Sequence, residues 1–196
     1  MFGSLPPATR ALILINVAVY LLQQFAGPVM AAYFALWPLG SGLFHPWQLV
    51  TYAFLHDPNG LAHIFFNMFA LFMFGRPLEQ YWGPRRLVIF YLVCVVAAAL
   101  TQLAVQQSTG ATEEVLGASG GVFGLLLAFA WYFPRQRVML LFPPIPMPAW
   151  LFVTLYGVIE LTNGVLGTNA GVAHFAHLGG MLGAGVLLWH WRNATR

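Results

Sequence analysis

A serine set among glycines is the first candidate for chemistry in this sequence. The stretch EEVLGASGGVFGLL, residues 113–126, places Ser119 in a G-x-S-x-G spacing and then continues as apolar sequence. A serine hydroxyl is a weak nucleophile until a neighbouring imidazole accepts its proton. His174 and His177 lie in a second glycine-rich apolar stretch, AHFAHLGGMLGAG, residues 173–185. Ser119 activated by one of these histidines would make the protein a hydrolase.

A third segment, HIFFN, residues 63–67, can supply hydrogen-bond donors to such a reaction. An attacked carbonyl group develops an oxyanion, and preorganised N–H donors stabilise it. The candidates are the His63 ring, the Asn67 amide and the backbone N–H groups near Ser119. The three segments indicate acyl transfer if the fold brings them to one place.

The elements that must position these residues are membrane helices. Of the 196 residues, 60% are hydrophobic and 7% are charged, whereas soluble domains have about 25% charged residues. The sequence predicts one all-α, polytopic membrane domain over residues 1–196, with six transmembrane helices and a long interfacial loop, 27–60, between the first two. The predicted spans are 8–26, 61–81, 86–106, 117–133, 149–166 and 171–191.

The arginines predict the orientation of these spans. All eight basic residues are arginines, and they fall on one side if the six spans alternate in direction. Basic residues concentrate on the cytoplasmic side, so we expect both termini there. Asp57, Glu113 and Glu114 lie on the opposite side. The net charge of +3 therefore reflects membrane topology and not a nucleic-acid partner.

Counting along the spans places three candidates at one depth. The second, fourth and sixth spans all run from the outer to the inner side, and a helix rises about 1.5 Å per residue. Asn67, Ser119 and His177 then lie about 5 to 10 Å below the outer surface. Phe123, one turn after Ser119, shares its helix face and can stack on the histidine ring. A shared level on separate elements is what a catalytic site requires.

Glycines spaced by four residues favour close packing of two membrane helices. The pairs are Gly117/Gly121, Gly120/Gly124 and Gly179/Gly183, in the fourth and sixth spans. We expect them to bring these two spans close enough for Ser119 to reach a histidine ring.

The sequence resembles the rhomboid family of intramembrane serine proteases over essentially its whole length. The resemblance rests on four motifs in order: HIFFN, GRPLEQYWG at 75–83, GASG at 117–120 and AHLGG at 176–180. It implies that Ser119 is the nucleophile and His177 the general base, in a dyad without a carboxylate. It also implies an oxyanion hole formed by His63, Asn67 and the backbone of Ala118 and Ser119.

The same resemblance implies what the protein acts on. Family members cleave transmembrane helices of other proteins near the outer face, so the expected partners are membrane-protein substrates and lipid, with no cofactor, metal or nucleic acid. The basic six-span form is similar to the bacterial type, which indicates a bacterial plasma membrane. Because a substrate must enter from the lipid, we expect the fifth span and residues 163–171 to move.

Two positions depart from the family's pattern. The loop between the first two spans often carries a Trp-Arg pair, whereas Trp47 is followed here by Gln48, so any brace that the arginine provides is missing. A tyrosine often stacks on the catalytic histidine, whereas Phe123 keeps the ring without the hydroxyl.

The remaining polar residues leave alternatives open. His174 and His177 could hold a metal, but no third Cys, His or acidic ligand accompanies them, so we expect none. The motif favours His177 as the base, with His174 lining the cavity. Glu160, in the fifth span, is interpreted as facing water or the interface and not as a triad acid.

Two other classes of function compete with a protease. A non-catalytic rhomboid-like protein that escorts membrane clients would be expected to have lost the serine or the histidine, and this sequence retains both. A small transporter would need polar residues down to the inner face, whereas the fourth and sixth spans become apolar below Ser119 and His177.

Overall fold

The chain folds as a bundle of helices, so the predicted all-α fold class is confirmed. The computed structural model describes residues 5–139, 144–167 and 173–194. Its helices are α1 (Pro7–Phe34), α2 (Gln48–Thr51), the 3₁₀ turn η1 (Tyr52–Phe54), α3 (Leu61–Ala70), the π-helical turn η2 (Leu71–Gly75), α4 (Arg76–Trp82), α5 (Pro84–Thr109), α6 (Ser119–Tyr132), α7 (Ala149–Leu166) and α8 (His174–Ala194). A small antiparallel pair, β1 (Arg137–Met139) and β2 (Pro146–Pro148), lies between α6 and α7.

Six helical rods correspond to the six predicted spans, because α3, η2 and α4 form one rod from Leu61 to Trp82. Within the described residues, four rods are long and apolar enough to cross a membrane: α1, α3 to α4, α5 and α7. α8 has 21 residues but carries three histidines and an arginine. α6 has only 14 residues, about 21 Å of helix. This is shorter than a hydrocarbon core, so α6 begins or ends below the membrane surface.

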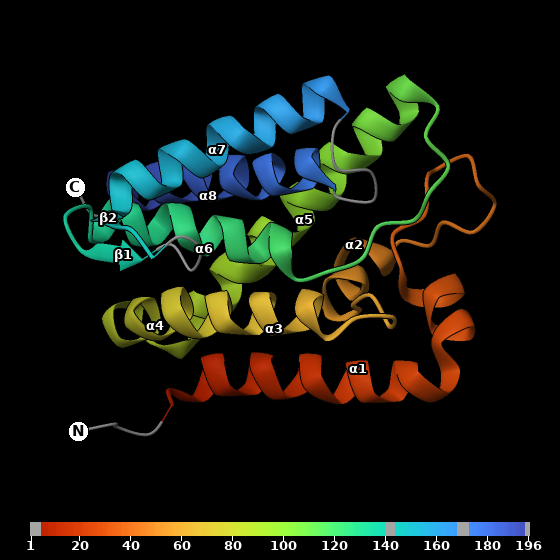
Figure 1. Cartoon of the computed structure of the whole chain (residues 1–196), viewed down its shortest axis with the longest axis horizontal. Helices are drawn as coiled ribbons and strands as arrows, with labels where there is room; N and C mark the ends of the chain where they lie inside the picture. The colour runs from red at the N-terminus through yellow and green to blue at the C-terminus, as the bar shows by residue number, and fades with distance from the viewer. Residues whose placement is uncertain (1–4, 140–143, 168–172, 195–196) are drawn as a thin grey trace.

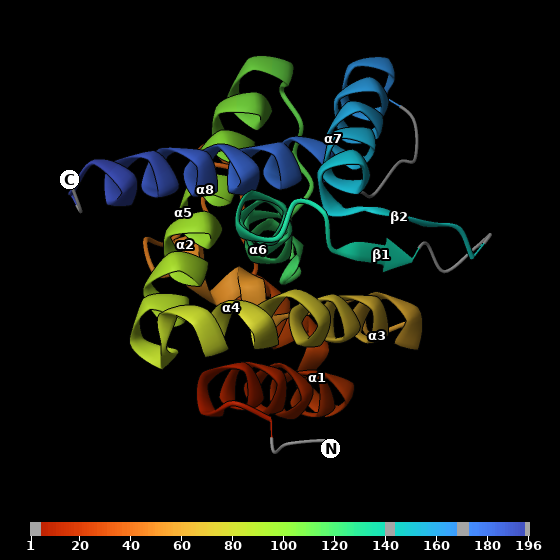
Figure 2. The same cartoon turned by 90° about the vertical axis from the view of Figure 1, so that its left-hand side faces the viewer.

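α6 occupies the middle of the bundle. Figure 2 looks almost along α6 and shows α5, α7 and α8 on one side of it and α3 and α4 on the other, with α1 outside them. In Figure 1, α1 begins and α8 ends at the same end of the bundle. A residue on α6 can therefore be reached from several helices at once.

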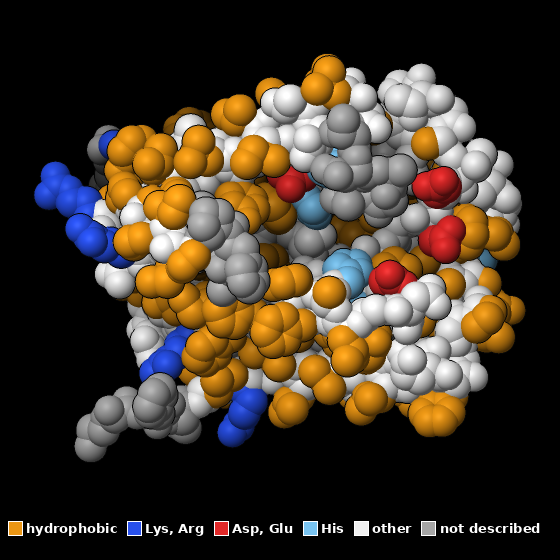
Figure 3. Space-filling model, in the orientation of Figure 1, with side chains coloured by type: hydrophobic (Ala, Val, Ile, Leu, Met, Phe, Trp, Pro, Cys, Tyr) orange, Lys and Arg blue, Asp and Glu red, His pale blue; other side chains and the backbone are white. Residues whose placement is uncertain are grey.

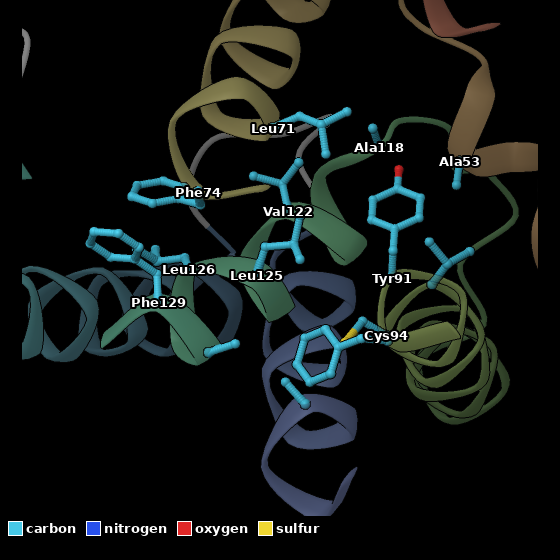
Figure 4. Close-up of a cluster of buried hydrophobic side chains, with 14 of the residues drawn as sticks. Ala53, Leu71, Phe74, Tyr91, Cys94, Ala118, Val122, Leu125, Leu126 and Phe129 are labelled. Carbon is cyan, nitrogen blue, oxygen red and sulfur yellow. The ribbon is translucent and has the colours of Figure 1, made fainter. Parts of the chain in front are cut away.

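Apolar side chains around α6 form the core. The residues packed together in Figure 4 include Leu71 and Phe74 from η2, Tyr91 and Cys94 from α5, and Val122, Leu125, Leu126 and Phe129 from α6. Burial of these side chains by three different elements fixes the position and rotation of α6.

Glycines let α8 approach its neighbours closely. A Cβ at Gly180 would overlap the backbone oxygen of Gly120, so α6 and α8 touch backbone to backbone there. Gly179 and Gly183 pack against α5 instead, where a Cβ at Gly179 would lie 2.5 Å from Thr101 Oγ1. The expected contact between the fourth and sixth spans exists, but its assignment to the Gly179/Gly183 pair was wrong.

α1 is longer than predicted, because it continues to Phe34 through residues that the sequence assigned to the interfacial loop. Ala26 has a non-helical backbone, with φ −130° and ψ 25°, and divides the helix in two. Pro28 is then in the first turn of the second segment, where a proline costs no helical hydrogen bond. The chain therefore bends at Ala26, and Pro28 does not end the helix.

Gln48 braces the loop between α1 and α3, and its side chain is buried. Its Oε1 accepts the backbone N–H groups of Trp37 at 3.3 Å and His45 at 3.2 Å. Its Nε2 donates to the carbonyl oxygens of Leu43 at 2.9 Å and Tyr33 at 3.3 Å. Because an amide both donates and accepts, Gln48 ties this loop together without an arginine.

Charged side chains divide between the two ends of the bundle. On the face in Figure 3, arginines gather at one end, while acidic side chains lie toward the other end and around a hollow. At the arginine end, Glu79 is buried and its carboxylate accepts the N–H groups of Ala8 at 2.8 Å and Thr9 at 2.7 Å. Glu79 thus satisfies the free N–H groups at the start of α1.

Candidate active site

Ser119 is the first residue of α6. The N–H groups in the first turn of a helix have no carbonyl partner within it, so this end attracts negative charge. Backbone hydrogen bonds hold the preceding loop: Leu36 and Val115 form a bridge, and the Gly117 N–H donates to the Tyr52 carbonyl at 3.0 Å. The serine is therefore positioned by main-chain contacts on both sides.

Gly117 leaves room beside the serine. Its φ of +125° is one that residues with a side chain rarely adopt. A Cβ there would lie 2.9 Å from His63 Nε2 and 3.7 Å from Ser119 Oγ. Gly117 therefore lies before α6 and borders the site, so its expected pairing with Gly121 in helix packing was wrong.

His177 contacts Ser119, in the arrangement that the sequence predicts. Its Nε2 lies 2.7 Å from Ser119 Oγ, a hydrogen bond between α8 and α6. Phe123 stacks on the imidazole, with ring centroids 4.3 Å apart and planes 6° apart. In the described part of the chain, His177 and not His174 is hydrogen-bonded to the serine.

His63 and Asn67 project from α3 toward the same space. His63 Nδ1 accepts the backbone N–H of Asp57 at 3.2 Å, so the neutral ring carries its proton on Nε2, the atom nearest to Gly117. Asn67 Nδ2 donates to the His63 carbonyl at 2.9 Å, which uses one of its two N–H groups. Each side chain therefore retains a donor for a group bound near Ser119.

Glu160 is a functional candidate that the sequence analysis considered and set aside. It is buried, and its Oε2 lies 2.7 Å from His174 Nδ1 and 2.8 Å from His177 Nδ1. An acidic residue does accompany the two histidines, and the three possible ligand atoms lie within 4.8 Å of one another. The interpretation of Glu160 as facing water or the interface was therefore wrong.

A groove of 1690 Å³ opens beside these residues; α3, η2, α6 and α7 line it, together with parts of α1, α5 and the loop before α6. Figure 3 shows a hollow on this face with histidine and acidic side chains around it. The groove is polar at one end and apolar toward β1. Its lining includes His63, Asn67, Ser119 and His177 at the polar end and Met73, Phe74, Leu126, Val138 and Phe152 at the apolar end.

Fold and site together define a polytopic helical membrane protein with a serine and a histidine hydrogen-bonded inside the bundle. The family model described as Rhomboid domain matches residues 43–193. The chain therefore belongs to the rhomboid family.

Curated relatives carry rhomboid names. The chain is similar to "Rhomboid protease GlpG" of Serratia proteamaculans, with 30% identity over 97% of this chain and 64% of the relative. It is 27% identical to "Rhomboid protease AarA" of Providencia stuartii, over 89% of this chain and 68% of the relative. It is also 32% identical to "RHOMBOID-like protein 6, mitochondrial" of Arabidopsis thaliana, over 69% of this chain and 40% of the relative. The chain thus spans 64% of the length of the GlpG relative.

Proposed function

We propose that the protein is an intramembrane serine protease in which Ser119 is the nucleophile and His177 the general base. The observation that carries this proposal is the 2.7 Å hydrogen bond between His177 Nε2 and Ser119 Oγ. The relatives named as rhomboid proteases support the reaction class. The Rhomboid domain match includes both residues.

In the proposed reaction, His177 Nε2 takes the hydroxyl proton while Ser119 Oγ attacks the carbonyl carbon of the scissile peptide bond. The tetrahedral intermediate collapses, the C–N bond breaks, and His177 returns the proton to the leaving amine. Water then attacks the acyl ester on Ser119, with His177 again acting as base, and releases the carboxylate product.

The proposed oxyanion hole lies between α3 and the first turn of α6. Its donors are His63 Nε2, Asn67 Nδ2 and the backbone N–H groups of Ala118 and Ser119. The hydrogen bond from Asp57 to His63 supports a neutral, donating ring. Fixed donors of this kind stabilise a developing oxyanion without reorganising.

We propose that the substrate is a transmembrane segment and that it enters through the groove between α3 and α7. Most apolar side chains of α7 are exposed, and its buried residues are Ala149, Phe152, Val153 and Glu160. A helix held by one narrow face can move aside at low cost. The proposed mobile cap, residues 163–171, is described only as far as Gly167; its remainder lies outside the described residues.

We also propose that the arginine end of the bundle faces the cytoplasm of a bacterial cell and that the site opens to the outer side. The arginine-rich end visible in Figure 3 and the bacterial sources of the GlpG and AarA relatives support this placement. Toward β1, the described residues that line the groove are apolar, which disfavours a transporter.

The test is covalent labelling of the detergent-purified protein by a fluorophosphonate probe. We expect the wild type to label, and Ser119→Ala and His177→Ala each to lose about 10³-fold in labelling rate, because each substitution removes one half of the dyad. Ser108→Ala is a matched control, since Ser108 is exposed at the end of α5.

The same variants should lose cleavage of a model transmembrane substrate reconstituted in liposomes. Equal labelling of the wild type and Ser119→Ala, with both proteins folded, would contradict the proposed function.

A further inference from the structure

Glu160 contacts the His177 ring on the side opposite Ser119. His177 Nδ1 lies 2.8 Å from Glu160 Oε2, and its Nε2 lies 2.7 Å from Ser119 Oγ. The order is therefore carboxylate, imidazole, hydroxyl, contributed by α7, α8 and α6. A carboxylate in this place fixes the tautomer of the histidine and stabilises the imidazolium that forms during attack.

Glu160 is directed into the bundle by the one buried face of α7. The buried residues Ala149, Phe152, Val153 and Glu160 are spaced by three, one and seven, which places them along one side of a helix. A buried carboxylate is costly unless its lone pairs are used. The N–H groups of two histidines, His174 and His177, satisfy Oε2.

The distances identify these contacts as hydrogen bonds. Zinc ligands lie about 2.0 to 2.2 Å from the metal, so two ligand atoms around one ion are about 3.3 Å apart. The observed separations between carboxylate and ring nitrogens are 2.7 and 2.8 Å. These separations are the lengths of hydrogen bonds between a carboxylate and imidazole N–H groups.

We infer that Glu160 is a positioning residue that keeps the proton of His177 on Nδ1. This inference rests on the proposed function for its kinetic consequence, but not for the tautomer itself. With Nδ1 protonated, the Nε2 lone pair faces the Ser119 hydroxyl and can accept its proton. His174 donates to the same oxygen and so limits the directions that the carboxylate can take.

The groove adds a separate prediction about substrate binding. Glu160 is not among the described residues that line it, whereas His177 and Ser119 are. Because Glu160 contacts the His177 imidazole and does not line the groove, its substitution should affect the chemical step and not the contacts with substrate. Its loss should therefore lower kcat and leave KM nearly unchanged.

The kinetic experiment compares Glu160→Gln and Glu160→Leu with the wild type on a model transmembrane substrate. Glu160→Gln keeps an acceptor oxygen and loses the charge, so we expect kcat to fall about tenfold. Glu160→Leu loses both, so we expect a fall of about 10²-fold or more, with KM within twofold. Glu79→Gln is the matched control, because it alters another buried carboxylate that touches α1 and not the site.

The deciding measurement is the ¹⁵N spectrum of the His177 imidazole, assigned by its absence in His177→Asn. We expect Nδ1 to carry the proton in the wild type and in Glu79→Gln, and the proton to be shared between the two nitrogens in Glu160→Leu. A role confined to helix packing would not move this proton.

An unchanged tautomer in Glu160→Leu would overturn the inference, as would activity that a chelator abolishes and zinc restores. The spectrum gives its answer whether or not the protein cleaves a substrate. Failure of the proposed function shows separately, as labelling that does not depend on Ser119.

Discussion

His56 is a buried imidazole in the loop before α3. The His63 ring lies edge-on to the His56 ring, with ring centroids 5.1 Å apart. Burial, and secondarily the neighbouring His63, lowers the pKa of His56 from 6.5 to about 4. The folded protein therefore holds His56 neutral under conditions in which an unfolded chain would protonate it.

This burial predicts a loss of stability in acid. Below pH 6.5 the unfolded state binds more protons than the folded state, so stability should fall as the pH drops from about 6.5 to about 4, by about 3 kcal/mol for this group. His56→Phe keeps an aromatic ring and removes the titration. Between pH 6.5 and pH 4, its thermal midpoint in detergent should therefore fall by about 5 to 10 °C less than that of the wild type. His190→Phe, at an exposed histidine, is the matched control. Parallel curves for His56→Phe and the wild type would contradict this role.

At the residue scale, the sequence predicted the contacts that follow from helix spacing. Ser119, Phe123 and His177 meet because a fixed rise per residue sets their depth and a shared face sets their direction. Glu160 was set aside as a triad acid because Thr162 and Asn163 follow it closely and favoured a water-facing position. Counted back from Leu166, Glu160 lies six residues, about 9 Å, from the outer end of α7, which is the same level.

At the scale of elements, the contact of α6 with α8 depends on Gly180. A Cβ there would overlap the Gly120 carbonyl, so Gly180→Ala must push the two helices apart. We expect the thermal midpoint to fall by about 4 to 8 °C and probe labelling to fall at least tenfold, because the dyad spans this contact. In the control Gly185→Ala, the added Cβ would lie 3.9 Å from Leu127 Cδ2, an ordinary contact. Equal labelling of the two variants would contradict this account.

The sequence predicted the existence and order of the rods better than their rotation and ends. Apolar length and arginine placement set the six spans, and α7 matches its predicted bounds, 149–166. The rotation of α8, which turns Gly180 toward α6 and Gly179 toward α5, depends on packing that no single-helix pattern contains. The extension of α1 was missed because Pro28 follows a bend at Ala26, which only the backbone angles show.

At the scale of the whole molecule, aromatic side chains line the apolar end of the groove, where η2 and α7 face each other. Phe152 is 9% exposed, stacks on Tyr156 with centroids 4.6 Å apart, and lies 6.5 Å from the Phe74 ring. Phe152→Ala should loosen α7 and admit substrate faster.

We expect cleavage of a transmembrane substrate by Phe152→Ala to rise about two- to fivefold relative to probe labelling, while stability falls. Trp150→Ala is the control, because Trp150 lies on the same helix and is 53% exposed. A cleavage rate that falls in proportion to labelling would show that α7 does not limit entry.

Glu160 belongs to α7, whereas Ser119 and His177 belong to helices in backbone contact at Gly120 and Gly180. If α7 swings outward to admit a substrate, it carries the carboxylate away from His177. Substrate entry and activation of His177 would then occur in different positions of α7. While α7 is open, His177 lacks its carboxylate partner, and the contact forms again only when α7 closes behind the substrate. A substrate helix that does not bind stably in the groove would therefore be released without being cleaved.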